Sequence, residues 1–337
     1  LILVSLCSCG AFVPQLGGNG ATRSRRNFGM AKEPEDAFER ALQEALKLSD
    51  ESSKLPSLED FQTKKAGGTK MKGFGAMGGG DIRVAQNDAL KDWLGNNGVW
   101  VFDRSDWGKA PHSLAVAIDT VDEYENEKAG RGMMADREMK EGDLLFSMPL
   151  DLLLTKAKAQ EILGRNVITD DLSEYIAIAL LLVGEKAKGA DSFWKPYIDI
   201  LPTVDEVYPT YCWTQEDLDS LEGSPVVRAT ESMKLKLRKE YEALLEPGGV
   251  IYKHKDMFPT EVYTYDNFEW AFAMLFSRAI RLTSLSSGEA IALIPYADLF
   301  NHNPFANSYI DARETGMITK VDEVAVYADR GYKRMEQ

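Results

Sequence analysis

The segment from Leu293 to His302 ends an apolar run with three polar side chains close together in sequence. Asp298 comes first, and the pair Asn301-His302 follows it, next to two aromatic residues. Polar groups that converge at a strand end beside aromatic surface are typical of small-molecule sites. A histidine in such a place is more often structural than functional, so this segment needs support from other parts of the chain.

Two further motifs offer residues that could take part in binding. Gly130-Arg131-Gly132 stands directly before an apolar run, and Ser277-Arg278 lies late in a predicted helix. Glycine adopts positive φ without strain and lets another group approach the backbone closely. Arg278 could instead be a cation that satisfies the C-terminal dipole of its helix, and we favour its interpretation as a site residue.

In this order along the chain, these motifs resemble the SET-domain methyltransferase family, in the branch named for the Rubisco large-subunit methyltransferase. The phrase Pro149–Thr155 follows the Gly-x-Gly motif as in that branch, and Phe193–Tyr197 with Leu201-Pro202 matches its helical insert. The resemblance extends from Leu90 to Gln337. Several motifs in the right order make it far more specific than any one of them.

The resemblance implies a site for S-adenosyl-L-methionine and no metal. By position, the backbone of Ala129, Gly130 and Arg131 should face the cofactor, while Asn301 and His302 should hold its adenine region. The residues that match positions on the side of the substrate are Ser277, Arg278, Asp298 and Tyr309. Tyr309 could equally be a half-buried aromatic residue of a strand.

The chain departs from the pattern of that branch at two positions and at its end. Ala129 stands where the branch often has Glu, and Leu282 stands where it usually has Arg, which puts side-chain contacts to the cofactor in doubt. The family's catalytic tyrosine belongs to a Tyr-Gly phrase after the last strand. Tyr332 falls in the turn before that strand, so the catalytic residue is unknown and is expected beyond Gln337.

The implied reaction is methylation of a lysine side chain in a non-histone protein. Free lysine has a pKa near 10.4, so burial in a narrow apolar channel must help the target amine lose its proton. Two alternatives remain open. The chain could be a histidine methyltransferase of the same family, or a catalytically inactive SET module that only binds cofactor or a protein partner.

Hydrophobic patterns predict the elements that would position these residues. The expected strands are 114–118, 132–135 and 144–148, then 291–295, 309–312, 317–321 and 324–328. Between the two groups the period is helical from Thr155 to Leu282, and one helix should start in a capping box formed by Asp266 and Glu269. Strands, a long helical insertion and strands again predict an α+β SET-domain fold whose sheets are completed from both sides of the insertion.

The expected organisation has five parts. They are a signal- or transit-type presequence at 1–32, an acidic helix and Gly-rich linker at 33–86, the first SET part at 87–154, the helical insertion at 155–285, and an incomplete second SET part at 286–337. The folded part should begin near Asn87. The glycines between Gly67 and Gly80 are read as a linker, because no apolar strand precedes them as a phosphate-binding loop requires.

The composition narrows the class of partner. The 337 residues carry a net charge of −14, which argues against a nucleic-acid partner and is compatible with a basic, lysine-bearing segment of a protein substrate. Only three cysteines occur, which excludes a disulfide scaffold and favours a reducing compartment. We expect a monomer.

The N-terminal residues resemble a targeting sequence. An apolar run at Leu1–Leu6 precedes small residues, and it is too short to span a bilayer, so no stable membrane insertion is expected. Phe12 and an Arg/Ser-rich, acid-poor tract follow, as in the bipartite plastid presequence of algae with secondary plastids. The alternatives are a secretory route, or a cytoplasmic protein with a disordered N-terminus.

Overall fold

The computed structural model describes residues 81–99, 113–121, 128–301, 310–316 and 320–336. The predicted presequence at 1–32 and the predicted acidic helix and linker up to residue 80 lie outside these residues. The predicted linker is wrong at its end, because the residues from Ile82 to Gln86 belong to the helix Ile82–Asn96. The chain divides into two units. The described residues of the first unit, which holds the sheets and the candidate site, fall within 81–209 and 237–336, and those of the second are 210–236.

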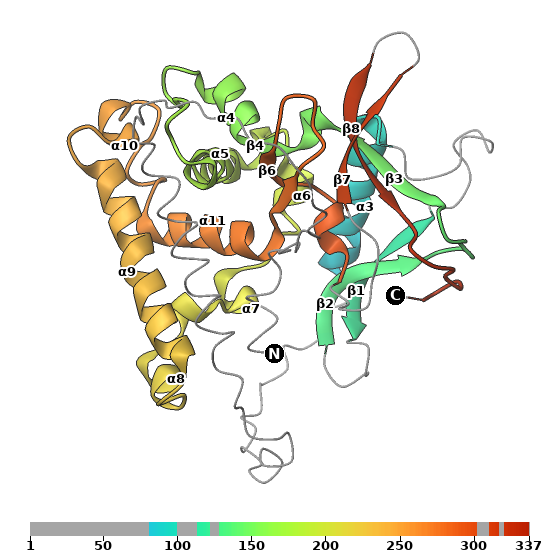
Figure 1. The fold of residues 1–337 in the computed structure, drawn as a ribbon, viewed down its shortest axis with the longest axis horizontal. Coiled ribbons are helices and arrows are strands. Elements are labelled where there is room, and N and C mark those ends of the chain that lie inside the picture. Colours follow the sequence, from blue (N-terminus) through green and yellow to red (C-terminus); the bar gives the residue numbers. More distant parts are fainter. Residues whose placement is uncertain (1–80, 100–112, 122–127, 302–309, 317–319, 337) are drawn as a thin grey trace, which may run out of the picture. The chain divides into compact units, whose positions relative to one another are not determined.

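Three small antiparallel sheets lie in the first unit (Figure 1). They are β1 (Leu114–Val121) with β2 (Lys128–Ala135), then β3 (Leu144–Pro149), β8 (Val321–Tyr327) and β7 (Ile310–Thr315) in that order, then β4 (Leu154–Thr155), β6 (Ala290–Leu293) and β5 (Ile280–Leu282) in that order. Two sheets join strands from before and after the helical region, since β3 pairs with β8 and β4 pairs with β6. This confirms the predicted fold, with sheets completed from both sides of an insertion.

The helices follow the order of the chain. They are α3 (Ile82–Asn96), α4 (Lys156–Leu163), α5 (Glu174–Lys188), α6 (Lys195–Ile198), α7 (Val204–Val207), α8 (Gln215–Asp219), α9 (Pro225–Leu245), α10 (Val250–Lys253) and α11 (Tyr265–Arg278). A short 3-10 turn, η6 (Ala297–Leu299), lies between β6 and β7. Of the helices, α8 and the first half of α9 belong to the second unit.

The core of the first unit is built around α5. Eight consecutive residues, Ile176–Val183, are buried, because α4, α11, β4 and β6 all pack against this helix (Figure 1). A helix that is apolar on every side is stable only when other elements surround it. The spacing of Leu172, Ile176, Ala179, Leu180 and Val183 in the sequence predicts a helix with one buried face, and the packing partners bury the rest.

Two features of the helical region differ from the prediction. Helix α11 has Thr264 as its N-cap, whose Oγ1 accepts from the Asn267 N–H at 3.3 Å, so the capping box predicted at Asp266 and Glu269 is wrong. The threonine hydroxyl lies one residue before the first helical turn, where it can satisfy a free backbone N–H. In addition, β5 forms at Ile280–Leu282, within the stretch predicted to be helical, because its backbone pairs with β6.

The ends of several elements also differ. Helix α3 begins at Ile82 rather than near Asn87, because Asp81 caps it by accepting from the Arg83 N–H at 3.0 Å. Strand β2 begins at Lys128, earlier than predicted, because its partner β1 extends to Val121, beyond the predicted end at residue 118. Of the strand predicted at 317–321, residues 317–319 lie outside the described part of the chain. Its last residue, Val321, is the first residue of β8, so the predicted gap between this strand and the next is absent there.

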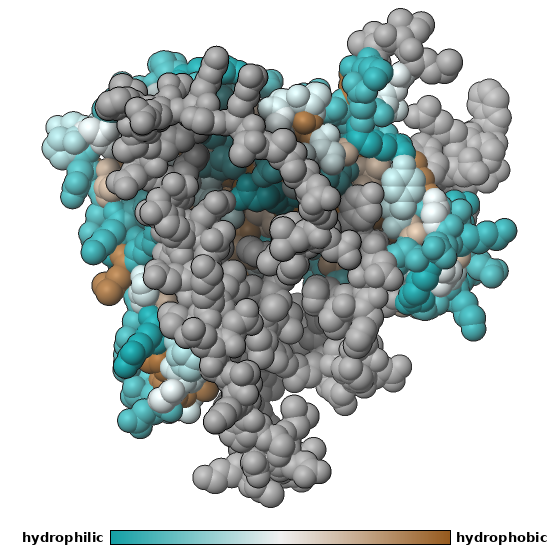
Figure 2. All heavy atoms as spheres, in the orientation of Figure 1, coloured by the Kyte–Doolittle hydropathy of each residue, from teal (hydrophilic) through white to brown (hydrophobic). Residues whose placement is uncertain are grey.

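The face drawn in Figure 2 is mainly polar where it is coloured. Its hydrophilic atoms are interrupted by small hydrophobic areas in several places, some of them near α8 and α9. Within the second unit, Thr214 and Asp217 form a capping box that starts α8. None of the described helices is both long and apolar enough to cross a membrane.

Candidate functional site

The Gly-x-Gly motif lies in β2, at a point where only glycine fits. Gly130 has φ of +74°, in the left-handed region that L side chains rarely adopt. A β-carbon on Gly132 would lie 2.6 Å from Asn301 Nδ2 and 2.7 Å from Thr120 Cγ2. These distances are shorter than any stable contact, so Gly132 lets the segment after β6 approach β2 directly, whereas Gly130 is needed for its backbone conformation.

A short chain of hydrogen bonds holds this approach together. Asn301 Nδ2 donates to Thr120 Oγ1 at 2.9 Å, and the Thr120 hydroxyl donates to the Gly130 carbonyl at 2.9 Å. Thr120 is buried, so these polar groups satisfy one another away from water. The structure therefore joins Gly130 and Asn301, two residues predicted to hold the cofactor.

The turn that carries Asp298 and Asn301 is strained and firmly packed. Tyr296 has φ of +75° and ψ of −44°, a backbone conformation that costs on the order of 1–3 kcal/mol in a residue with a side chain. Its ring is fully buried and meets Phe146 of β3 edge to face at 5.5 Å, while Phe300 stacks on Phe146 at 6.1 Å. This aromatic packing offsets the strain and fixes the direction in which η6 leaves β6.

Beside this turn lies a buried polar cluster of Arg278, Asp298 and Tyr197. Arg278 Nη1 donates to both the backbone carbonyl and the Oδ2 of Asp298, each at 3.1 Å. The Tyr197 hydroxyl donates to the same Oδ2 at 2.9 Å. The Asp298 side chain is fully buried and that of Arg278 is 20% exposed, so this ion pair lies largely in a low-dielectric environment.

Burial dominates the electrostatics of the cluster. It raises the pKa of Asp298 above its ordinary value, although the Arg278 guanidinium and the Tyr197 hydroxyl act to lower that pKa. Burial also raises the pKa of Tyr197 well above that of an exposed tyrosine. Arg278 Nε and Asp298 Oδ1 are buried and have no hydrogen-bond partner in the described part of the chain.

Arg131, between the two glycines, directs its side chain to the scaffold. Its Nε donates to Asn87 Oδ1 at 3.1 Å, its Nη1 donates to the Ile200 carbonyl at 3.1 Å, and its Nη2 donates to Gln86 Oε1. Burial lowers the pKa of Arg131 from its ordinary value. The guanidinium thus ties β2 to α3 and to the insertion, which leaves the backbone of Arg131 as the part that could face a ligand.

Other predicted site residues are placed differently or lie outside the described part. The Ser277 hydroxyl donates to the Ala273 carbonyl of its own helix at 2.6 Å, so its proton is already used. Ala129 is a residue of β2. His302 and Tyr309 lie outside the described residues, so their predicted roles remain predictions.

The structure also places Leu282, where the related branch usually has Arg, and Tyr332 near the end of the chain. Leu282 is fully buried, whereas the neighbouring Arg281 points outward and pairs with Glu289 at 3.4 Å, because successive residues of a strand face opposite sides. Tyr332 follows β8, and its hydroxyl donates to Asp329 Oδ1 at 2.6 Å. Its backbone exchanges two hydrogen bonds of 2.9 Å with Met139 in an isolated antiparallel bridge, so Tyr332 is not a turn residue as the sequence predicted.

Sequence reasoning missed two residues of the site. Thr120 lies in a strand of ordinary β-type composition, and no local pattern distinguishes its hydroxyl. Tyr197 belongs to the Phe-Trp-Lys-Pro-Tyr phrase, which the sequence assigned only to the helical insert. Both residues join the site through contacts with residues far apart in sequence, Thr120 with Asn301 and Tyr197 with Asp298.

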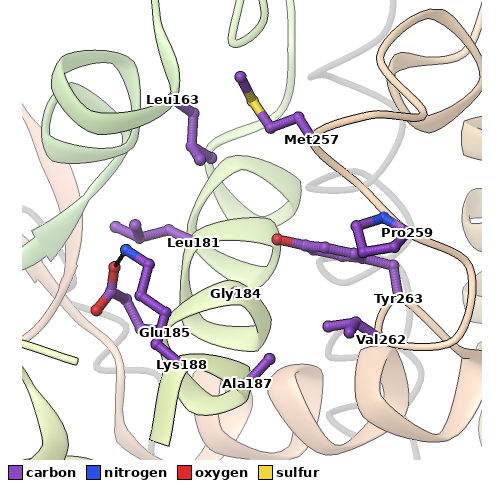
Figure 3. A pocket seen from close by; sticks show the side chains of 10 residues that line it. All are labelled: Leu163, Leu181, Gly184, Glu185, Ala187, Lys188, Met257, Pro259, Val262 and Tyr263. Atoms are coloured by element: carbon purple, nitrogen blue, oxygen red, sulfur yellow. Dashed lines mark hydrogen bonds and ion pairs between the residues drawn. The ribbon is translucent and has the colours of Figure 1, made fainter. Parts of the chain in front are cut away.

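A separate cavity lies away from this cluster (Figure 3). It has a volume of about 330 Å³ and is lined mainly by apolar residues of α5 and of the segment before α11. None of the predicted site residues lines it. Among the described residues, no group of His, Cys, Asp and Glu side chains is arranged to hold a metal ion.

Comparison with known proteins identifies relatives of one kind. No family model matches the sequence. The chloroplastic Rubisco large-subunit N-methyltransferase of Nicotiana tabacum is 33% identical over 175 residues, which cover 52% of this chain and 33% of that protein. The chloroplastic fructose-bisphosphate aldolase-lysine N-methyltransferase of Arabidopsis thaliana is 31% identical over 180 residues, again 52% of this chain and 34% of that protein.

Solved structures lead to the same family. The SET domain of LSMT, crystallised with lysine and AdoHcy, matches with a TM-score of 0.60 and 26% identity over 75% of this chain and 53% of that chain. Rubisco LSMT bound to AdoMet matches with a TM-score of 0.56 and 26% identity over 75% of this chain and 51% of that one. The chain thus spans about a third of the curated relatives and about half of the solved chains. Its described residues carry a SET-domain fold that is similar to that of the Rubisco large-subunit N-methyltransferases.

Proposed function

We propose that the protein is an S-adenosyl-L-methionine-dependent protein-lysine N-methyltransferase. The observation that carries this proposal is the contact between Gly132 of β2 and Asn301, bridged by Thr120, inside a SET-domain fold. Related proteins with the same fold are named as lysine N-methyltransferases, and solved examples contain AdoMet or AdoHcy.

The residues present fit such a cofactor. A β-carbon on Gly130 would have no atom within 4 Å, so the space beside this residue is open to a ligand, while Gly132 makes room for Asn301 and Thr120. The backbone of Ala129, Gly130 and Arg131 would hold one end of the cofactor, and Asn301 with His302 would hold its adenine end. When bound, the cofactor supplies a methyl group on a sulfonium sulfur, and the neutral thioether that remains after transfer is a good leaving group.

The protein's own part is to place and deprotonate the target amine. Arg278 and Asp298 form a largely buried pair on the predicted substrate side, and Arg278 Nε and Asp298 Oδ1 have no hydrogen-bond partner in the described part of the chain. A buried, apolar environment lowers the pKa of a lysine, which favours the neutral amine that attacks. Holding that amine in line with the methyl group accounts for much of the rate.

We further propose that the substrate is a plastid protein. The tobacco and Arabidopsis relatives are both named as chloroplastic enzymes. The Arg/Ser-rich, acid-poor tract after Phe12 supports import into a plastid, and the bipartite pattern supports an alga with a secondary plastid. Import of the N-terminal residues fused to a fluorescent protein tests this part; retention in the cytoplasm contradicts it.

Cofactor binding is tested by calorimetry with S-adenosyl-L-methionine. Gly132→Ala should abolish detectable binding, because the new β-carbon would collide with Asn301 and Thr120. Gly95→Ala is a matched control, since a β-carbon on Gly95 of α3 has no atom within 4 Å. Equal binding by both variants would refute the proposed cofactor site.

Turnover is tested with the full-length protein, labelled cofactor and a plastid extract. A discrete labelled protein whose modified residue is lysine supports the proposal. Label on histidine identifies the histidine methyltransferase alternative. Cofactor binding without any transfer identifies the inactive module, and either of these results overturns the proposed activity.

A further inference from the structure

We propose that Tyr197, in the helical insertion, is a positioning residue that orients Asp298 and Arg278 on the substrate side of the site. This inference rests on the proposed function and deepens it. It assigns a role in the chemistry to a segment that the sequence analysis matched only to the helical insert.

Tyr197 belongs to a short stretch that anchors several distant segments. Within residues 194–200, the Trp194 Nε1 donates to the Leu152 carbonyl at 2.8 Å, and the Ile200 carbonyl accepts from Arg131 at 3.1 Å. The Asp199 carbonyl accepts from Gln86 Nε2 at 2.9 Å. Tyr197 is therefore held in a frame that also fixes the Gly-x-Gly strand.

Tyr197 contacts the cluster of Arg278 and Asp298 through its hydroxyl group. Its side chain is fully buried, and its hydroxyl makes the 2.9 Å bond to Asp298 Oδ2. That oxygen also accepts from Arg278, so the carboxylate is held from two directions. Two donors on Oδ2 prevent rotation of the carboxylate and leave Oδ1 in one place.

The chemistry explains why a tyrosine suits this position. A phenol donates a hydrogen bond to a buried carboxylate without adding a charge. Its deprotonation is strongly disfavoured, since burial raises the pKa of Tyr197. Tyr197 thus remains a neutral hydrogen-bond donor across the physiological pH range, and Arg278 alone supplies the positive charge that pairs with Asp298.

Removing the hydroxyl should change how Asp298 titrates. The side chains that act on the pKa of Asp298 in the described part of the chain are Arg278 on α11 and Tyr197 on α6. Arg278 also faces the guanidinium of Arg131 on β2, whose pKa it helps to lower. The Tyr197 hydrogen bond lowers the pKa of Asp298, so its loss raises that pKa further. Protonation of Asp298 would then begin at a higher pH.

The test uses Tyr197→Phe in the full-length protein and two calorimetric titrations. One measures the affinity for S-adenosylhomocysteine, and the other measures L-lysine binding to protein saturated with it. We expect lysine affinity to fall about tenfold, as for one lost hydrogen bond to a charged group, while cofactor affinity changes less than about threefold. The pH below which lysine binding is lost should move upward.

Tyr241→Phe is the matched control. Tyr241 also donates one hydrogen bond of 2.9 Å, to the Tyr263 carbonyl, and it lies outside the site. This variant should lower the melting temperature and leave both affinities and the pH limit unchanged. If Tyr197→Phe weakens both ligands equally, or leaves the lysine affinity and pH limit as in the wild type, Tyr197 is only a structural residue.

The two proposals fail in different ways. A wild-type protein that binds no cofactor refutes the proposed function. A wild-type protein that binds cofactor but not lysine contradicts the placement of Asp298 on the substrate side, and with it this role of Tyr197. Normal wild-type binding of both ligands leaves the variant as the deciding measurement.

Discussion

Asn301 donates its side-chain N–H to the Thr120 hydroxyl at 2.9 Å, although 181 residues separate them. The same hydroxyl donates to the Gly130 carbonyl, so one buried oxygen connects β1, β2 and the segment after β6. The predicted cofactor residues thus depend on a threonine that touches both of their segments.

Thr120→Val tests this dependence with a side chain of nearly the same shape. The variant leaves Asn301 Nδ2 and the Gly130 carbonyl without their shared partner. We expect the free energy of unfolding to fall by about 1–3 kcal/mol and cofactor affinity to fall about tenfold. Urea denaturation and calorimetry measure the two effects. Thr120→Ser keeps the hydroxyl and should restore most of the affinity; failure of that rescue would contradict the proposed role.

Arg131→Lys tests the link between the Gly-x-Gly strand and its scaffold. A lysine cannot reproduce the three directions in which the guanidinium donates, to Asn87, Ile200 and Gln86. We expect a loss of about 1–3 kcal/mol in the free energy of unfolding, with weaker cofactor binding. Arg334→Lys, at an exposed position, is the control and should be neutral. Identical stabilities for the two variants would contradict this prediction.

Asp311 should stabilise the fold in a pH-dependent way. Its carboxylate accepts from the N–H and hydroxyl groups of Thr283 and Ser284, and these bonds outweigh its partial desolvation and lower the pKa of Asp311 to about 2. A depressed folded-state pKa means that this stabilisation is present above the unfolded value of 3.8. It is lost as the pH falls toward the folded value.

Asp311→Asn should therefore be less stable than the wild type at neutral pH, and the difference should shrink below about pH 4. Urea denaturation at a series of pH values measures this convergence. Asp256→Asn makes the same chemical change at an exposed position and should follow the wild type throughout. A constant difference between Asp311→Asn and the wild type at every pH would exclude the titration of Asp311 as the cause.

Tyr263 and Tyr241 should respond differently to loss of the hydroxyl. Tyr263 lines the cavity of Figure 3, and its hydroxyl has no hydrogen-bond partner in the described part of the chain, while burial raises its pKa to about 12. Tyr263→Phe should change the free energy of unfolding by less than about 0.5 kcal/mol. Tyr241→Phe loses a hydrogen bond and should cost about 1 kcal/mol. Thermal unfolding of both variants measures these changes. A larger loss of stability for Tyr263→Phe than for Tyr241→Phe would contradict the prediction.

Local patterns predicted the type of most elements and the choice of several site residues. The apolar period predicted α5, and apolar runs predicted strands on both sides of the insertion, such as β3 before it and β8 after it. Both patterns involve residues close together in sequence, so they can be recognised without knowledge of the fold. The N-cap of α11 was misplaced because Thr264 and Asp266 both suit a helix start, and backbone geometry chose between them.

The sequence by itself determined that Gly130 and Gly132 would admit a close neighbour, and that polar groups would follow β6. Steric size and residue order are properties of the chain alone. Only the tertiary structure decided that the neighbour is Asn301, that Thr120 joins the two, and that Tyr197 holds Asp298. These contacts link residues far apart in sequence, and they arise from strand pairing and burial that no local pattern encodes.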